Sequence, residues 1–185
     1  IYNDIFKLEP GSLVVFDINK RTLEKKTYWD LKKQINEKKE FTNDQVKIEE
    51  NLKNLIDNSV EKQMVADVPV GCFLSGGVDS TLIASTMQKL SNKPIKTFSI
   101  GFDDPRYDES ENAKEVASFL KTDHYSYKLN ADDIFNIIPE INNIYTEPFA
   151  DSSQIPSIFL SRIAKKEVKV VLTGDGGDEF FGGYN

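Results

Sequence analysis

The chain has 185 residues, of which 39% are hydrophobic and 29% charged, a composition typical of a globular protein with one sizeable core. The formal net charge of −7 disfavours a nucleic-acid partner, and a single cysteine excludes an internal disulfide. No apolar stretch reaches membrane-spanning length and the first residues lack the apolar core of a signal peptide, so we expect no membrane partner and a cytoplasmic location.

Residues 1–40 predict a β-rich segment that is followed by a charged linker. The stretch "SLVVFDI" is typical of a short apolar strand, and "RTLEKKTYW" is its expected antiparallel partner across a turn at Asp17–Lys20. Lysine, glutamate, glutamine and asparagine dominate from Leu31 to Glu40, a composition that indicates a solvated linker.

A second predicted region covers residues 41–185 and opens with a helix that begins at "TNDQ". Thr42 and Gln45 have the spacing of a capping box, in which each side chain satisfies an exposed backbone donor. The apolar residues that follow recur at helical spacing and predict one stripe that packs on a sheet. They are Ile48, Leu52, Leu55, Ile56, Val60 and Met64.

Strands and helices alternate through the remainder of the chain. The predicted strands span 68–74, 94–102, 124–130 and 168–174, and the predicted helices span 78–90, 109–121, 131–145 with a break at Pro139, and 155–166. This alternation indicates βαβ crossovers. We therefore expect an α/β fold, with a mostly parallel sheet that carries helices on both faces.

The loop "SGGVDST" follows the first strand of this predicted sheet, at the edge where α/β proteins bind ligands. Gly76 and Gly77 let backbone amides approach a ligand closely, and the next helix points its N-terminus at the same place. Ser75, Ser80 and Thr81 add hydroxyl donors. The loop therefore predicts a phosphate site, and the alternative is a tight glycine turn without a ligand.

Carboxylates accompany this predicted anion site. Asp79 lies inside the loop, where it would repel a bare phosphate unless Mg²⁺ lay between them. A second glycine-rich loop, "GDGGDEFFGGY", follows the last predicted strand and adds Asp175, Asp178 and Glu179. The pair of loops predicts a magnesium site, and the alternatives are a helix-start aspartate placed for the helix dipole and a flexible acidic loop.

Four ordered motifs resemble the synthetase domain of glutamine-hydrolysing asparagine synthetase, in the ATP pyrophosphatase (PP-loop) superfamily. They are "FLSGGVDSTLIAS", "FSIGFDDPRYDESENAKEVASFLKTDH", "EPFADSSQIP" and "VVLTGDGGDEFFGGYN", and the similarity runs from about Glu49 to Asn185. The resemblance implies an adenine nucleotide α-hydrolase-like, Rossmann-like fold. It also implies a chain truncated at both ends, with residues 1–40 as the tail of a glutaminase domain.

The resemblance assigns roles to residues of the two loops and the neighbouring strands. Contacts to ATP and its pyrophosphate are assigned to Leu74, Ser75, Gly76, Gly77, Val78, Asp79, Ser80, Ile100, Thr173 and Gly174. Formation of the acyl-adenylate is assigned to Asp175, and Mg²⁺ binding to Asp79 and Asp178. The expected cofactors are ATP and Mg²⁺.

The implied reaction is amidation of aspartate. The side-chain carboxylate of aspartate attacks the α-phosphorus of ATP to give β-aspartyl-AMP and pyrophosphate, and ammonia derived from glutamine then releases asparagine and AMP. The glutaminase nucleophile and a catalytic lysine of the family are expected outside this chain, so we expect the chain alone to be inactive. Members of the family often form dimers, so the resemblance also implies a possible homodimer.

Three rival functions remain open at this point. One is an asparagine-synthetase-like amidotransferase that acts on another carboxylate. A second is a tRNA-thiolating pyrophosphatase, which the single cysteine and the acidic charge disfavour. The third is a nucleotide-binding module without catalysis, which the paired carboxylates disfavour.

Three features outside the two loops allow more than one interpretation. Cys72 lies in an apolar run and is interpreted as a small buried hydrophobic residue. His124, the only histidine, is interpreted as structural and not as a general base. In "EPFADSSQIP", Asp151, Ser152 and Ser153 either bind substrate or start the next helix.

Overall fold

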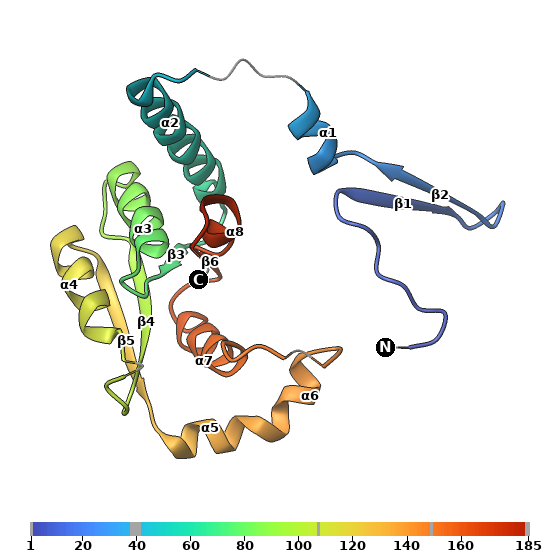
Figure 1. Cartoon of the computed structure of the whole chain (residues 1–185). Helices are drawn as coiled ribbons and strands as arrows, with labels where there is room; N and C mark the ends of the chain where they lie inside the picture. Colours follow the sequence, from blue (N-terminus) through green and yellow to red (C-terminus); the bar gives the residue numbers. More distant parts are fainter. Residues whose placement is uncertain (1, 38–41, 107, 149, 184–185) are drawn as a thin grey trace. The chain divides into compact units, whose positions relative to one another are not determined.

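The computed structural model describes residues 2–37, 42–106, 108–148 and 150–183, and its contacts divide the chain into two units, Ile1–Ile48 and Glu49–Asn185 (Figure 1). The strands are β1 Ser12–Asp17, β2 Thr22–Thr27, β3 Val70–Phe73, β4 Lys96–Phe102, β5 Asp123–Leu129 and β6 Val170–Leu172. The helices are α1 Leu31–Asn36, α2 Gln45–Met64, α3 Val78–Leu90, α4 Ser110–Leu120, α5 Ala131–Ile137, the short 3-10 helix η1 Ile138–Glu140, α6 Ile141–Ile144, α7 Gln154–Ala164 and α8 Gly177–Phe181.

The first unit contains the predicted hairpin. β1 and β2 pair antiparallel, with Ser12 opposite Thr27, and Asp17 Oδ1 accepts hydrogen bonds from the backbone N–H groups of Asn19 and Lys20, both at 2.9 Å. These bonds hold the turn where the sequence placed it.

The interpretation of residues 31–40 as a linker is wrong for its first part, because 31–36 form α1. Asp30 caps this helix, since its Oδ1 accepts a hydrogen bond from Lys33 N at 3.0 Å. Lysine and glutamine are good helix formers, so the same polar composition suits an exposed helix as well as a linker. Residues 38–40 lie outside the described residues.

The start of α2 also differs from the prediction. The helix begins at Gln45, and Asp44 supplies the cap, because its Oδ1 accepts from Val46 N at 3.1 Å and from Lys47 N at 3.4 Å. Thr42 instead accepts from the backbone of Asp44, at 3.2 Å. The predicted capping box is therefore wrong, since a carboxylate one residue before the helix captures the same free amides.

The sheet of the second unit is parallel, in the order β5-β4-β3-β6. From β3 the chain moves outward through β4 to β5, and then returns to place β6 on the other side of β3. The register sets Cys72 between Thr97 and Leu172. The strand order therefore reverses beside β3, and the loops after β3 and β6 leave the sheet side by side.

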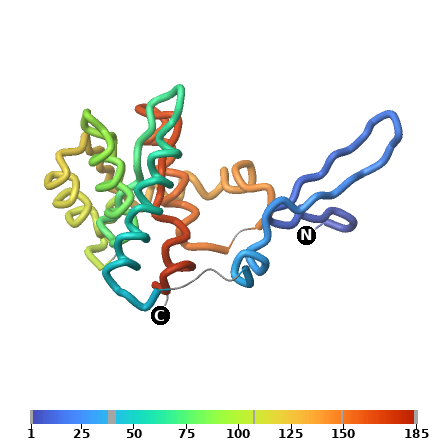
Figure 2. The backbone as a smooth tube through the Cα atoms, turned by 90° about the horizontal axis from the view of Figure 1, so that it is seen from above, coloured from blue at the N-terminus to red at the C-terminus, as the bar shows by residue number. Residues whose placement is uncertain are grey.

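Helices cover both faces of this sheet, so the predicted α/β class is confirmed (Figures 1 and 2). On one face, α2, α3 and α4 cover a core that consists of Val60, Cys72, Leu74, Ala84, Met87, Ile95, Ala113, Ala117 and Leu172. On the other face, α7 and the loop after it pack through Ala164 and Val168 against Phe98.

The apolar stripe of α2 is buried only toward its C-terminal end. Val60 is 2% exposed, and Ile56 and Met64 pack partly against the core. Ile48 is 47% exposed, because the core contacts come from the later turns of the helix. Leu55 is 68% exposed although its neighbour Ile56 packs on the core, since successive residues of a helix point in directions about 100° apart. Helical spacing alone does not tell how far the supporting sheet extends.

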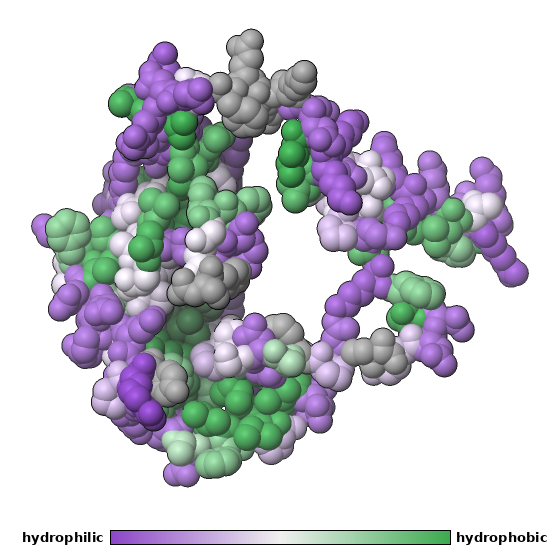
Figure 3. Space-filling view, viewed as in Figure 1, coloured by the Kyte–Doolittle hydropathy of each residue, from purple (hydrophilic) through white to green (hydrophobic). Residues whose placement is uncertain are grey.

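The predicted helix over 131–145 is interrupted at Pro139, as expected, and forms α5, η1 and α6. Apolar side chains gather on the surface of this segment (Figure 3), and among them Phe135 is 68% exposed, Ile138 47% and Ile144 43%. Within the described residues, no helix is both long and apolar enough to cross a membrane.

Candidate functional site

The loops after β3 and β6 contact each other through glycines. A Cβ on Gly174 would lie 2.8 Å from Ser80 N and 2.9 Å from Asp79 Cβ. A Cβ on Gly177 would lie 2.6 Å from the Asp79 carboxyl carbon. Only glycine lets the second loop approach the start of α3 this closely, and α/β sheets bind ligands where the strand order reverses.

The loop after β3 is closed by its own hydroxyl groups. The Oγ atoms of Ser75 and Ser80 lie 2.9 Å apart, Ser75 N donates to Ser80 Oγ at 3.2 Å, and Gly77 N donates to Ser75 Oγ at 3.2 Å. Gly76 adopts the left-handed conformation, with φ +88°. This tight loop leads directly into α3, and because the N-cap residue is Gly77, no N-cap side chain occupies the amides of the first turn. The first-turn amides and the positive end of the helix dipole therefore face the loop, which favours an anion.

One hydroxyl of this region is not satisfied within the protein. Thr81 Oγ1 is buried and has no hydrogen-bond partner in the part of the chain that the structure describes. The remaining hydroxyls of the loop engage the loop itself, so they position it before any ligand arrives.

A pocket of about 510 Å³ lies beside these loops. Four of the site residues predicted from the sequence line this pocket, namely Asp79, Thr173, Gly174 and Asp175. The lining residues that sequence reasoning missed include Ser59, Gln63, Phe180 and Phe181. Gln63 Nε2 donates to Ser59 Oγ at 3.2 Å, and this pair lies four residues apart next to the apolar stripe of α2. Two polar residues at this spacing are common on helix surfaces, so the sequence carried no signal that they line a pocket.

Asp175 and Asp178 take different positions around α8, a helix that the sequence did not predict. Thr173 Oγ1 donates to Asp175 Oδ2 at 3.0 Å, which holds that carboxylate at the pocket. Asp178 lies in the first turn of α8, directly after the residue that contacts Asp79, but it is not among the described residues that line the pocket.

The residues present fit a magnesium ion by their chemistry. Among the described residues no group of three or more metal-binding side chains is found. Magnesium needs fewer, because it is usually held by one or two carboxylates together with substrate phosphates and water. Asp79 approaches Gly177, the neighbour of Asp178, whereas the Asp178 carboxylate lies against Gly183, so joint binding of one Mg²⁺ by the two carboxylates stays a prediction.

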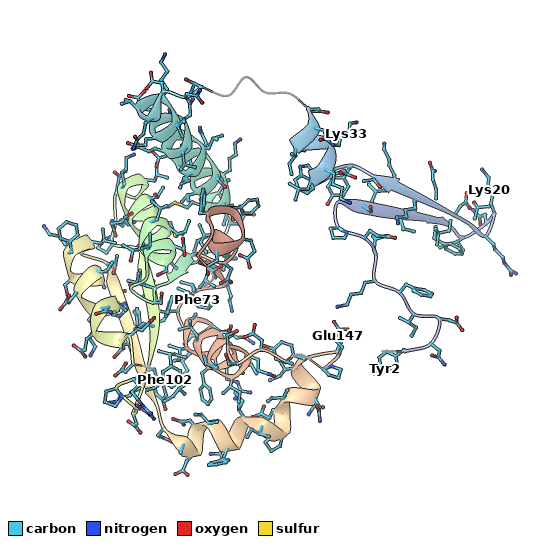
Figure 4. The ribbon with its side chains drawn as sticks, viewed as in Figure 1. Tyr2, Lys20, Lys33, Phe73, Phe102 and Glu147 are labelled. Atoms are coloured by element: carbon cyan, nitrogen blue, oxygen red, sulfur yellow. The ribbon has the colours of Figure 1, made fainter. Side chains whose placement is uncertain are left out.

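Two further predicted nucleotide contacts lie at the ends of adjacent strands. Leu74 follows β3, is 1% exposed, and donates its backbone N–H to Phe98 O at 2.8 Å. Ile100 lies near the end of the neighbouring β4. Phe73 and Phe102, which Figure 4 labels, are the last residues of these two strands.

The single histidine is held by hydroxyl groups. His124 Nδ1 lies 2.9 Å from Thr97 Oγ1, and its Nε2 lies 3.2 Å from Ser99 Oγ. Thr97 and Ser99 are 0% and 2% exposed. Burial lowers the pKa of His124, and Lys114 lowers it further. A neutral imidazole whose two nitrogens both form hydrogen bonds fits the interpretation of His124 as a structural residue.

Cys72 is buried in the sheet, as predicted, and burial raises the pKa of its thiol to about 12.

The stretch around Asp151 forms local hydrogen bonds ahead of α7. Asp151 Oδ1 accepts from Ser153 N at 2.7 Å and from Ser153 Oγ at 2.6 Å. Ser153 occupies the N-cap position of α7 without a side-chain capping bond, so its hydroxyl does not cap the helix. Substrate binding by these residues stays a prediction.

The sequence model named asparagine synthase matches residues 51–185. The chain belongs to the asparagine synthase family. It is 43% identical over 187 residues to the "Putative asparagine synthetase (glutamine-hydrolyzing) 2" of Methanocaldococcus jannaschii, covering 100% of this chain and 35% of that protein. It is 36% identical over 183 residues to asparagine synthetase (glutamine-hydrolyzing) 1 of Bacillus subtilis, covering 97% of this chain and 27% of that protein. The chain thus spans between about a quarter and a third of the length of these asparagine synthase relatives.

A solved structure supports the fold. The ammonia-dependent NAD synthetase of Campylobacter jejuni, in complex with a nitrate ion, superposes with a TM-score of 0.50 and 15% sequence identity. The match covers 74% of this chain and 60% of the NAD synthetase chain. At this identity the likeness concerns the fold alone.

Proposed function

We propose that the chain forms the nucleotide-binding part of a glutamine-hydrolysing asparagine synthetase, which uses ATP to activate the side-chain carboxylate of aspartate. The observation that carries the proposal is the contact of Asp79 with Gly174 and Gly177, where the strand order of the sheet reverses. Membership of the asparagine synthase family supports the reaction type.

In the first step, an oxygen of the aspartate carboxylate bonds to the α-phosphorus of ATP, and the bond from that phosphorus to the bridging oxygen breaks. Pyrophosphate leaves with the electron pair. The loop 75–80 would hold the leaving pyrophosphate through backbone amides and hydroxyls, while Leu74 and Ile100 would contact the adenosine. Such fixed donors stabilise charge that develops in the transition state.

Asp79 and Asp178 would hold Mg²⁺, which would neutralise charge on the phosphates when bound. Thr173 and Gly174 would line the nucleotide site beside them. Asp175, whose carboxylate is held by Thr173, would face the forming acyl-adenylate. In these roles the side chains of the chain would hold the aspartate carboxylate in line with the α-phosphorus of ATP.

In the second step, ammonia bonds to the acyl carbon, a proton is lost, and AMP leaves, which gives asparagine. The ammonia would come from glutamine, through a glutaminase domain. A reaction that consumes ATP and free amino acids suits a cytoplasmic enzyme. Pairing of two copies stays a prediction.

The test is exchange of labelled pyrophosphate into ATP by the full-length protein. We expect exchange that requires aspartate, and loss of exchange in Asp79→Asn, because an amide binds a magnesium ion far more weakly than a carboxylate. Asp132→Asn, a change at an exposed carboxylate on α5, is the matched control and should retain exchange.

Two outcomes would change the proposal. Exchange with another carboxylic acid but not with aspartate would keep the family chemistry and replace the substrate. Binding of ATP without exchange in the presence of any acid would favour a nucleotide-binding module without catalysis.

A further inference from the structure

The first turn of α4 supports the loop that follows β3. A Cβ on Gly76 would lie 2.7 Å from Asn112 Cβ and 2.8 Å from Ala113 N. The turn of the loop therefore rests directly on the start of α4, and Figure 2 shows α3 and α4 running side by side.

The start of α4 is itself held in place from β4. Asp108 Oδ1 accepts a hydrogen bond from Ser110 N at 3.0 Å. A Cβ on Gly101 would lie 2.7 Å from that Oδ1 and 2.8 Å from Ser110 Oγ, so glycine in β4 admits both side chains. Ser110 is only 6% exposed. The backbone of this turn therefore has a defined position relative to the loop.

No contact within the fold accounts for the side-chain carboxamide of Asn112. Its side chain is exposed, and among the described residues no hydrogen bond engages its carboxamide. A capping role would require a hydrogen bond from the carboxamide to a backbone group, and none is found for Asn112 among the described residues. The carboxamide, carried by a Cβ that lies against Gly76, thus offers two N–H donors that no described residue uses.

The loop needs neutral donors if it binds phosphate, because residues 75–81 include no lysine or arginine. We propose that Asn112 is a further nucleotide-binding residue, whose Nδ2 donates a hydrogen bond to the pyrophosphate portion of ATP. The proposal rests on the function proposed above. It adds to the nucleotide site a side chain from α4, the helix that follows β4.

The test measures equilibrium binding of pyrophosphate, ATP and AMP by calorimetry, with Mg²⁺ present, to the full-length protein and to Asn112→Ala. Loss of one hydrogen bond to a charged group should weaken binding of pyrophosphate and ATP about tenfold. AMP, which lacks the pyrophosphate portion, should bind within about twofold of wild type. Asn136→Ala, which changes an exposed asparagine on α5, is the matched control and should bind all three ligands as the wild type does.

Asn112→Asp provides a second, isosteric variant. It places a negative charge beside the phosphates, so pyrophosphate should bind more weakly than to Asn112→Ala, and added salt should reduce that difference. Alanine is a good helix former, so Asn112→Ala should melt at the wild-type temperature.

The two proposals fail in distinguishable ways. If wild type binds ATP and Asn112→Ala binds pyrophosphate and ATP equally well, the role of Asn112 is overturned alone. Weakened binding of AMP with unchanged binding of pyrophosphate also overturns it. If wild type binds neither ATP nor pyrophosphate, the proposed function and the role of Asn112 are overturned together.

Discussion

The carboxyl group of Asp79 lies against the backbone of Gly177, so that a Cβ on Gly177 would come within 2.6 Å of both Asp79 Cγ and Oδ1. The two residues open helices that follow different strands: Asp79 lies in the first turn of α3, after β3, and Gly177 begins α8, after β6. The glycine at the start of α8 therefore sets where the carboxylate on α3 can lie.

Gly177→Ala should displace the Asp79 carboxylate and reduce pyrophosphate exchange by about a hundredfold, the effect expected when a reacting group is misplaced by about 1 Å. The side-chain carboxylate can rotate away from the new methyl group, so the free energy of unfolding should change by less than about 1 kcal/mol. Exchange assays and urea unfolding check both expectations. A parallel loss of activity and stability would contradict the local explanation.

Gly76→Ala should destabilise the protein through two separate effects. Its left-handed φ of +88° costs a residue with a Cβ about 1–2 kcal/mol, and the contacts with Asn112 and Ala113 add about 1–3 kcal/mol. Gly182→Ala is the matched control, because φ there is +77° but nothing lies within 4 Å of a new Cβ. Urea unfolding should therefore show a larger loss for Gly76→Ala. Equal losses of unfolding free energy in the two variants would mean that α4 shifts to accommodate the new methyl group at no cost.

Acid should destabilise the protein through His124. Burial lowers its pKa in the fold, so the unfolded chain takes up a proton first as the pH falls. The stabilising contribution is present above the ordinary histidine pKa of about 6.5 and is lost as the pH falls toward the lower, folded value. The chain has no other histidine, so His124→Gln should flatten the pH dependence of the free energy of unfolding in this window. An unchanged slope would contradict this assignment.

Cys72 should be unreactive in the native protein. It is 0% exposed, and its thiol pKa is raised to about 12, whereas the thiolate is the reactive form. A thiol reagent should therefore label the chain only under unfolding conditions, at a rate that follows unfolding. Fast labelling of folded protein at neutral pH would show that this part of the sheet opens readily.

The sequence predicted the helix over 78–90 and the parallel α/β class because hydrophobic periodicity and glycine-rich turns are local signals. It failed at Asp44 and at residues 31–36, where several polar residues compete for a cap or suit both a helix and a linker. It also failed at α8, because the glycines at 176 and 177 indicated a loop, whereas Gly176 serves as a left-handed N-cap.

Four residues that the sequence singled out, Asp79, Thr173, Gly174 and Asp175, line the pocket, but their arrangement was not predictable. Periodicity does not tell which strand lies next to β3, so the contact of Asp79 with Gly177 requires the fold. The same limit hid Ser59 and Gln63, which line the pocket from a helix that precedes both loops.

The strand order also has a consequence for how the protein is made. Val70 of β3 pairs with Val170 of β6, a contact that closes a loop of about 100 residues, and such distant pairings form slowly. β6 is the last strand of the described chain to leave the ribosome, so the two glycine-rich loops meet only late in folding. Nucleotide affinity should therefore arise at the end of folding, and it would report that the native topology is complete.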